Sequence, residues 1–347
     1  MPLKLAIIGT GKVAREQYIP FLAGQRDAEG ERDVELGYWN RTAETARAIT
    51  QKYPGEVFAT LQEAADWKPD SALILTAETA RFEISRKLIL AGIPKIFFEK
   101  PLVAAGGQAH VTEADFHRGK ELLTLAKERH CETAMVFNYR FFDLTLAAKK
   151  AAAGRDFGRV TTITALVHFA CWSHVIDLIR HFAGDIAEVT ALAGTTVHSS
   201  PELQIQASDV AAAFGTAGGA TGTIVGTLAM QWQHPLYELT LTFERGRIHL
   251  RDLDGTLEIL AAPAPPASPA PPATHECISL SRHTSRWHPY DESFKKALAA
   301  YLHSLRTATP PPVPGMEGLR ELQFEAALKR SIAQHRPVRI DEEFPCE

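Results

Sequence analysis

Hydrophobic residues in the first third of the chain gather in short continuous runs, separated by longer amphipathic stretches. Such runs predict strands buried on both faces, and the stretches between them predict helices. Strands and helices that alternate in this way are typical of a parallel sheet with helices on both faces. The expected strands are residues 5–8, 34–39, 57–59, 71–76, 95–98 and 133–137, and the expected helices are 13–22, 61–67, 80–91 and 112–129.

From residue 158 onward the chain is rich in β-forming runs separated by hairpin signals, as at 217–219 and 244–246. Repeated hairpins predict an antiparallel sheet. The expected strands are 158–169, 186–196, 210–216, 220–232, 237–243, 247–250 and 256–260, and the expected helices are 144–153, 172–182, 292–305 and 315–334. Residues 261–273, AAPAPPASPAPPA, predict an exposed loop of polyproline type, because proline cannot pair within a sheet.

The turn after the first strand carries the first candidate chemistry, a Gly-x-Gly-x-x-Ala motif at residues 9–14. Gly9 suits the tight turn, and Gly11 lets the backbone approach a pyrophosphate without an intervening Cβ. The helix that follows directs its free N–H groups at phosphates. The alternative is a strand-to-helix turn that binds nothing. The expected cofactor contacts here are Gly9, Thr10, Gly11, Lys12 and Val13.

The end of the second strand bears on which dinucleotide is bound. An acidic residue at this place would hydrogen-bond the ribose 2′-hydroxyl of NAD, but the residues present are Asn40, Arg41 and Thr42. Arg41 can instead pair with a 2′-phosphate. We therefore expect NADP(H) to be favoured, with NAD(H) as the alternative; an ordinary solvated arginine is the other interpretation of Arg41.

Composition narrows the class of protein. With 347 residues the chain is long enough for two domains, and its net charge of −4 argues against nucleic-acid or anionic-membrane partners. The four cysteines lie far apart without metal-ligand spacing, so we expect a reduced, cytoplasmic protein with no metal site. No apolar run approaches the eighteen or so residues that a membrane span needs.

These patterns predict an α/β domain followed by an α+β domain. Residues 1–137 are expected to form a Rossmann dinucleotide-binding domain. Residues 138–347 are expected to form a mostly antiparallel sheet domain for substrate binding and oligomerisation, with the helix at 315–335 left open to packing back on the first domain. An antiparallel sheet commonly keeps one face free. Because that face needs a partner to cover it, we expect a homodimer or homotetramer.

Four motifs carry a resemblance to a known family. They are GTGKVA at 9–14, FEKP at 98–101, FNYRF at 137–141 and SHVIDLIRHFAG at 173–184. In order and approximate spacing they resemble the glucose-fructose oxidoreductase, inositol dehydrogenase and rhizopine-catabolism (Gfo/Idh/MocA) family over nearly the whole chain. The resemblance implies an NAD(P)-dependent oxidoreductase that transfers hydride between nicotinamide and a sugar, cyclitol or related polyol or keto compound.

The Glu-Lys-Pro motif gives the first catalytic candidate. The resemblance implies that Lys100 lies between nicotinamide and substrate, and that its bond to Pro101 is commonly cis. A lysine at the end of an apolar strand is partly desolvated, which suits it to pass a proton near neutrality. The alternative is a structural lysine neutralised by Glu99. Thr76, Glu99 and Lys100 complete the expected cofactor contacts.

The second catalytic candidate is His174. The family helix carries an Asp-x-x-x-His-x-x-Asp pattern that maps its histidine to His174 and its last aspartate to Asp177, but its first aspartate falls on Ala170. A register using Asp177 and His181 is disfavoured because it breaks the spacing to the glycine at 184. Tyr139 and Arg140 have two interpretations: they contact substrate or cofactor, or they only pack at the hinge between the domains. The expected substrate-binding residues are Tyr139, Arg140 and Asp177.

A second class of function remains open. The loss of an acid at Ala170 and the atypical segment 76–81, TAETAR, favour a catalytically silent dinucleotide- or sugar-binding regulatory protein. That segment lacks the proline and histidine that family members often show. Lys100 and His174 favour the enzyme. Neither the substrate nor the direction of the reaction follows from the residues.

Overall fold

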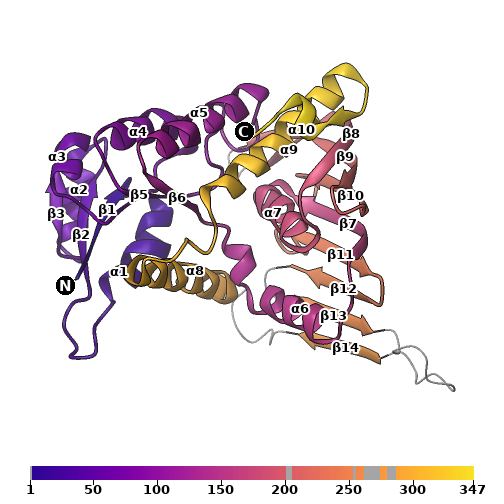
Figure 1. Cartoon of the computed structure of the whole chain (residues 1–347), viewed down its shortest axis with the longest axis horizontal. Coiled ribbons are helices and arrows are strands. Elements are labelled where there is room, and N and C mark those ends of the chain that lie inside the picture. The colour runs from indigo at the N-terminus through magenta and orange to yellow at the C-terminus, as the bar shows by residue number, and fades with distance from the viewer. Residues whose placement is uncertain (1, 201–204, 253–254, 262–273, 280–286) are drawn as a thin grey trace. The chain divides into compact units, whose positions relative to one another are not determined.

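The computed structural model describes residues 2–200, 205–252, 255–261, 274–279 and 287–347 (Figure 1). Apart from Ala261, the predicted Pro-rich loop lies outside the described residues. Two compact units are present, residues 1–137 with 294–322, and residues 138–293 with 323–347. Residues 294–322 group with the first unit. The sequence pattern placed residues 138–347 in the second domain and left only the helix at 315–335 open to packing back on the first.

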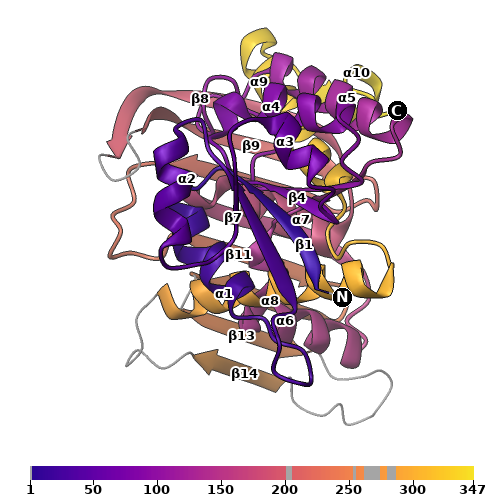
Figure 2. The ribbon, with the colours of Figure 1, turned by 90° about the vertical axis from the view of Figure 1, so that its left-hand side faces the viewer.

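The first unit is built on a parallel six-stranded sheet in the order β3-β2-β1-β4-β5-β6. Figure 2 shows α1 and α2 on one side of this sheet and α3 and α4 on the other, which confirms the Rossmann arrangement. The strands are β1 Leu3–Ile8, β2 Val34–Trp39, β3 Glu56–Phe58, β4 Ser71–Ile74, β5 Lys95–Phe98 and β6 Glu132–Met135. The helices are α1 Ile19–Ala23, preceded by a π-helical turn Ala14–Tyr18, α2 Ala43–Thr50, α3 Leu61–Asp66, α4 Glu78–Leu90 and α5 Glu113–Glu128.

Burial explains why β1 organises this sheet. Its last four residues, 5–8, are fully buried, as the apolar run predicts. It pairs with β2 on one side and β4 on the other, so the chain reverses its direction across the sheet at β1. Ligand sites of open α/β sheets lie at such a reversal, beyond the carboxyl ends of the strands.

The segment 294–322 completes the first unit with parts of α8 (Trp287–Thr307) and α9 (Gly315–Gln334). The ring of Tyr301 lies 4.5 Å from that of Phe97, and its hydroxyl bonds Ser71 Oγ at 2.7 Å. The start of α9 packs so tightly on β6 that a Cβ added at Gly315 would lie 2.3 Å from Thr133 Oγ1. These contacts explain why the segment groups with the first sheet.

The second unit holds a mostly antiparallel sheet, in the order β14-β13-β12-β11-β7-β10-β9-β8-β15 within the described residues. The β7–β10 pair is parallel. The strands are β7 Val160–His168, β8 Ile186–Ser200, β9 Ile205–Thr216, β10 Thr221–Thr227, β11 Tyr237–Phe243, β12 Gly246–Arg251, β13 Thr256–Ala261, β14 Thr274–Ser279 and β15 Val338–Arg339. The remaining helices are α6 Asp143–Gly154, α7 Trp172–Ala183 and α10 Ile340–Glu343.

Several details of this sheet differ from the prediction, including the start of β9 at Ile205 rather than at residue 210. β10 ends at Thr227 rather than near residue 232, because the Thr227 hydroxyl accepts the N–H of Ala229 and turns the chain. The edge strands β14 and β15 were not predicted. β14 is largely exposed and lacks apolar alternation, and β15 has only two residues.

One face of the second sheet is covered and the other is open. α6 and α7 lie on the same face in Figure 1. Along β7, Ile163, Ala165 and Val167 are buried, whereas Thr162, Thr164 and Leu166 are exposed. The period of two thus separates a core face from a free face, as the hairpin pattern predicts.

Candidate active site

A cavity of about 320 Å³ lies in the first unit at the carboxyl ends of β1, β2 and β4. Its position is the sheet reversal at which a dinucleotide is expected. It brings together residues from three separate predicted segments. The predicted cofactor residues that line it are Gly9, Gly11, Asn40, Arg41, Thr42 and Thr76.

The glycine turn has the geometry that the motif predicts. Gly9 has a φ of +100°, and a Cβ there would lie 2.7 Å from the backbone nitrogen of Thr76. A side chain is therefore excluded by both conformation and space. Gly11 faces open space, because a Cβ added there would meet nothing within 4 Å. The turn therefore has room for a pyrophosphate beside the backbone.

Two threonines support the fit of a dinucleotide. The buried hydroxyls of Thr10 and Thr76 have no hydrogen-bond partner among the residues that the structure describes. Buried polar groups usually have partners, so these two hydroxyls suit a polar ligand. Thr10 and its neighbours Lys12 and Val13 do not line the cavity, and Lys12 and Val13 are exposed.

Asn40 takes the place of the ribose-binding acid. Its Oδ1 accepts the N–H of Thr10 at 3.3 Å, and its Nδ2 donates to the Thr42 carbonyl at 3.2 Å. It therefore ties the β2 end to the glycine turn without adding a negative charge. Arg41 is exposed at the cavity wall.

Lys100 follows β5 and is half-buried, and its peptide bond to Pro101 is cis. Its ammonium Nζ donates to Gln108 Oε1 at 3.0 Å. The neighbouring carboxylate of Glu99 is buried and accepts hydrogen bonds from Tyr18 Oη and from the Lys100 N–H, both at 2.8 Å. Burial raises the pKa of Glu99, and the Lys100 charge opposes this effect. Glu99 thus supports the turn, while its predicted cofactor contact stays a prediction.

Arg81 is a residue of this site that the sequence reasoning missed. Its side chain is buried, and it donates to the carbonyls of Thr76 at 2.8 Å, Glu99 at 2.5 Å and Pro101. Burial lowers the pKa of this guanidinium, and the neighbouring Glu99 opposes that shift. One sign of this role is visible in the sequence: Arg81 is the positively charged residue in the atypical segment 76–81, which directly follows a buried strand.

In the second unit, His174 and Tyr139 form one buried cluster. Their rings stack with centroids 4.0 Å apart and planes 7° apart, and His174 is only 2% exposed. The Tyr139 hydroxyl donates to Cys171 Sγ at 3.1 Å. Burial raises the pKa of Tyr139 well above its ordinary value, so the phenol stays protonated. Tyr139 thus orients the imidazole rather than lying open on a surface.

Arg140 and Asp177 bind each other. The guanidinium makes two parallel bonds to the carboxylate, Nε to Oδ2 at 2.8 Å and an NH2 to Oδ1 at 2.6 Å. The Asp177 side chain is fully buried. This bidentate pair fixes the turn Asn138–Phe141 to α7. Their predicted substrate contact stays a prediction.

Ala170, which stands where the family pattern has its first aspartate, lies just before α7. Ala170 lies in the 3-10 turn Phe169–Cys171, and its N–H is accepted by His168 Nδ1 at 3.1 Å. The alternative histidine, His181, is kept neutral, because burial, with help from Arg140 and Lys149, lowers its pKa to about 3. Such a histidine cannot exchange protons near neutrality.

The described residues contain no group of three His, Cys, Asp or Glu side chains arranged to hold a metal ion. None of their helices combines the length and apolar character that crossing a membrane requires.

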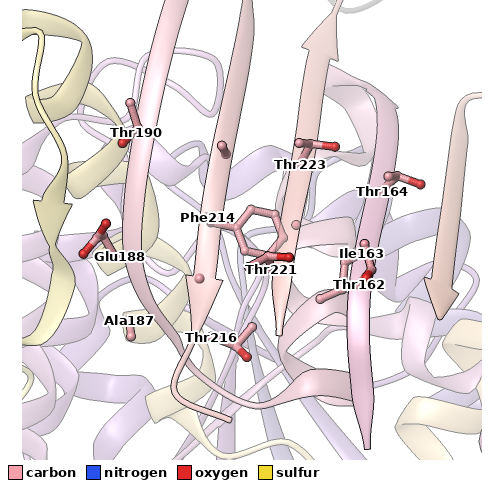
Figure 3. Close-up of a pocket in the computed structure, with 13 residues that line it drawn as sticks. Thr162, Ile163, Thr164, Ala187, Glu188, Thr190, Phe214, Thr216, Thr221 and Thr223 are labelled. Carbon is pink, nitrogen blue, oxygen red and sulfur yellow. The ribbon is translucent and has the colours of Figure 1, made fainter. Parts of the chain in front are cut away.

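A second hollow, of about 610 Å³, lies on the sheet of the second unit (Figure 3). Strands β7, β8, β9 and β10 line it, and threonines such as Thr164, Thr190 and Thr223 dominate its wall. It carries none of the predicted site residues. Glu188 is the acidic residue among those that line it.

Comparison with known proteins identifies the first unit. Residues 3–137 match an oxidoreductase family with an NAD-binding Rossmann fold, GFO_IDH_MocA. Residues 3–137 thus match the NAD-binding domain of the Gfo/Idh/MocA family. The resemblance stated from the motifs is thereby confirmed. A search of curated proteins by sequence gives no match.

Solved structures extend the likeness of fold over the whole chain. An oxidoreductase from Agrobacterium radiobacter, in complex with NAD⁺, L-tartaric acid and magnesium, is 17% identical, with 99% of this chain and 100% of that chain covered and a TM-score of 0.77. Levoglucosan dehydrogenase in complex with NADH is 15% identical, with coverages of 98% and 99% and a TM-score of 0.77. The WlbA dehydrogenase from Bordetella pertussis, in complex with NADH and UDP-GlcNAcA, is 18% identical, with coverages of 98% and 99% and a TM-score of 0.72.

Proposed function

We propose that this chain is an NAD(P)-dependent oxidoreductase that transfers a hydride between nicotinamide and a carbinol carbon of a sugar, cyclitol or related polyol. The observation that carries the proposal is Lys100, held at the end of β5 in the same unit as the glycine turn. The NAD-binding family match and the sugar dehydrogenases among the similar folds support it.

The residues of the first unit fit a dinucleotide. The glycine turn and the N–H groups after it would hold the pyrophosphate, and Thr76 offers a buried hydroxyl at the cavity wall to a polar atom. When bound, the nicotinamide supplies or accepts the hydride. Lys100 Nζ would hold the reacting oxygen and take up or return its proton. His174, its ring plane fixed by Tyr139, would assist at that oxygen.

The preferred cofactor is NADP(H). Arg41 lies at the cavity wall, and Asn40 leaves that place without the carboxylate that would repel a 2′-phosphate.

The absence of disulfides among the four cysteines, all in the described residues, supports a cytoplasmic location.

The assembly is a homodimer or homotetramer formed through the open face of the second sheet. Leu192 on β8 is 68% exposed, and Leu166 on β7 is 39% exposed. Both project from the same face as the threonines of Figure 3, because each is an even number of residues from one of them. An exposed face of this kind is suited to an interface with a second copy.

A panel of polyols and keto-sugars, tested with both cofactors for a change in reduced-nicotinamide absorbance, tests the proposal. Turnover of one class with dependence on Lys100 supports it. A regulatory protein is the second candidate, favoured by Ala170 and by the Arg140–Asp177 pair, which engages two of the three predicted substrate contacts. Tight dinucleotide binding with no turnover over the whole panel would establish that alternative.

A further inference from the structure

The backbone on both sides of Lys100 is held by one buried side chain. Arg81 donates to the carbonyl of Glu99, which precedes Lys100, and to the carbonyl of Pro101, which follows it. Its third acceptor is the Thr76 carbonyl at the cavity wall. A guanidinium presents its donors in a rigid planar fork, so one arginine can fix several carbonyls at once. Arg81 thus ties the carboxyl ends of β4 and β5 together.

The ammonium of Lys100 is held by a second residue outside β5. Gln108 Oε1 accepts from Nζ, and the Gln108 N–H is in turn anchored on Glu78 Oε1 at 3.0 Å. The Glu78 carbonyl also accepts the N–H of Ala104 at 3.4 Å. The first turn of α4 therefore holds the loop after Lys100 as well as the peptides beside it.

We propose that Arg81 and Gln108 are positioning residues for Lys100, Arg81 through the flanking peptides and Gln108 through the ammonium. An ammonium has three N–H donors, and Gln108 occupies one, which leaves donors for a substrate oxygen. The amide restrains the side chain without adding a charge. The effect on turnover rests on the proposed function, whereas the effect on the Lys100 amine itself does not.

Two variants of Gln108 separate positioning from general packing. Gln108→Leu removes the acceptor, whereas Gln108→Glu replaces it with a carboxylate that favours the protonated amine. Trinitrobenzenesulfonate reacts with the neutral form of an accessible amine. The full chain is labelled and then digested, and peptide mass spectrometry gives the rate at which Lys100 is modified. We expect about three- to tenfold faster labelling in Gln108→Leu and slower labelling in Gln108→Glu. A purely structural role would move both rates in the same direction.

Matched variants complete the test. Gln62→Leu removes a glutamine of the same unit that also makes one side-chain bond, to Asp66 Oδ1, and should leave Lys100 labelling unchanged. Arg81→Lys, which cannot span three carbonyls, should change Lys100 labelling and lower kcat more than it raises the KM for substrate. If Arg81→Lys does not fold, the two Gln108 variants still decide the matter.

The outcomes separate this proposal from the proposed function. Opposite shifts of the labelling rate in the two Gln108 variants support the positioning of Lys100 by Gln108. This holds even if no substrate in the panel is turned over, because the lack of turnover counts only against the proposed enzyme function. Unchanged labelling in both variants overturns positioning, even if the wild type turns over. Where a substrate is known, Gln108→Leu should lower kcat while dinucleotide affinity is kept.

Discussion

The imidazole of His174 lies face to face on the phenol ring of Tyr139, with 4.0 Å between ring centroids. Because both rings are buried and the phenol is itself bonded to Cys171, the plane of the imidazole is fixed before any substrate arrives. Ala170 stands where the resemblance places an acid, so under the proposed function we expect the stack to help orient the histidine. This relationship gives the first prediction.

Tyr139→Leu should lower kcat by about tenfold, because the imidazole loses its stacking partner and an aromatic pair is worth about 0.5–1.5 kcal/mol. Tyr139→Phe keeps the ring and loses only the bond to Cys171, and is the matched control. Steady-state kinetics on a substrate from the panel measures both. Equal losses in the two variants would show that the hydroxyl, not the stack, matters.

Cofactor preference is tested at Arg41. Arg41→Asp should weaken NADP(H) binding by about ten- to a hundredfold, because a charged hydrogen bond to the 2′-phosphate is lost and a repulsion is added. NAD(H) binding should change much less. Arg47→Asp, on the exposed side of α2 beside Glu44, is the control. Titration by protein fluorescence gives a dissociation constant for each of the three proteins with each cofactor, and equal wild-type affinity for both cofactors would contradict the assignment.

The open face of the second sheet makes a prediction about assembly. Light scattering on the wild type should give a multiple of 38.1 kDa, and Leu192→Asp should shift the mass toward one chain, because a charge is then placed in the interface. Leu146→Asp changes an equally apolar, 46% exposed residue on α6, over the other face, and should leave the mass unchanged. A wild-type mass near 38 kDa at micromolar concentration would rule the interface out.

Acid should weaken the ion pairs near the C-terminus. Hydrogen bonds from Arg336 and Arg330 lower the pKa of Glu343 from its usual 4.5 to about 2. A carboxylate with a lowered folded pKa contributes stability above its unfolded pKa, and loses it as the pH falls from about 4.5 towards 2. The contribution is therefore complete at neutral pH.

Glu343→Gln should accordingly lower the thermal midpoint at pH 7 by about 2 °C, since an exposed network is screened by solvent. The difference from wild type should shrink as the pH falls below about 4.5. Glu342→Gln, whose partner Arg339 lies 3.6 Å away on an exposed surface, is the control and should have a smaller effect. A difference that stays constant from pH 7 to pH 3 would contradict the linkage.

Much of the first unit could be predicted from the sequence because its signals are local. The apolar runs at 34–39 and 95–98 give strands with those bounds, and the glycine turn encodes its own geometry at Gly9. The grouping of the α8 residues 294–307 with the first unit could not be predicted in this way. An amphipathic helix shows that it has a partner but not which one, and Tyr301 finds Ser71, 230 residues away.

The site shows the same limit. Arg81 belongs to a residue type that is almost never buried without partners, and its partners are backbone carbonyls, which no residue pattern displays. Arg140 and Asp177 were predicted from the sequence to bind substrate. The sequence shows neither that they lie 2.6 Å apart nor that each satisfies the other. The sequence shows which residues are charged, but which of them form ion pairs depends on how the chain folds.

Lys100 gives the decisive test of the chemistry. Lys100→Met keeps the length and apolar stem of the side chain but removes the ammonium, so turnover should fall by about a hundred- to ten-thousandfold, the range of general acid-base assistance. Dinucleotide binding should survive, because the glycine turn and the Thr76 cavity are untouched. His174→Ala should cost less if the imidazole only assists. Turnover of Lys100→Met at the wild-type rate would remove the lysine from the mechanism, and the proton would then have to be carried by His174 or by another group.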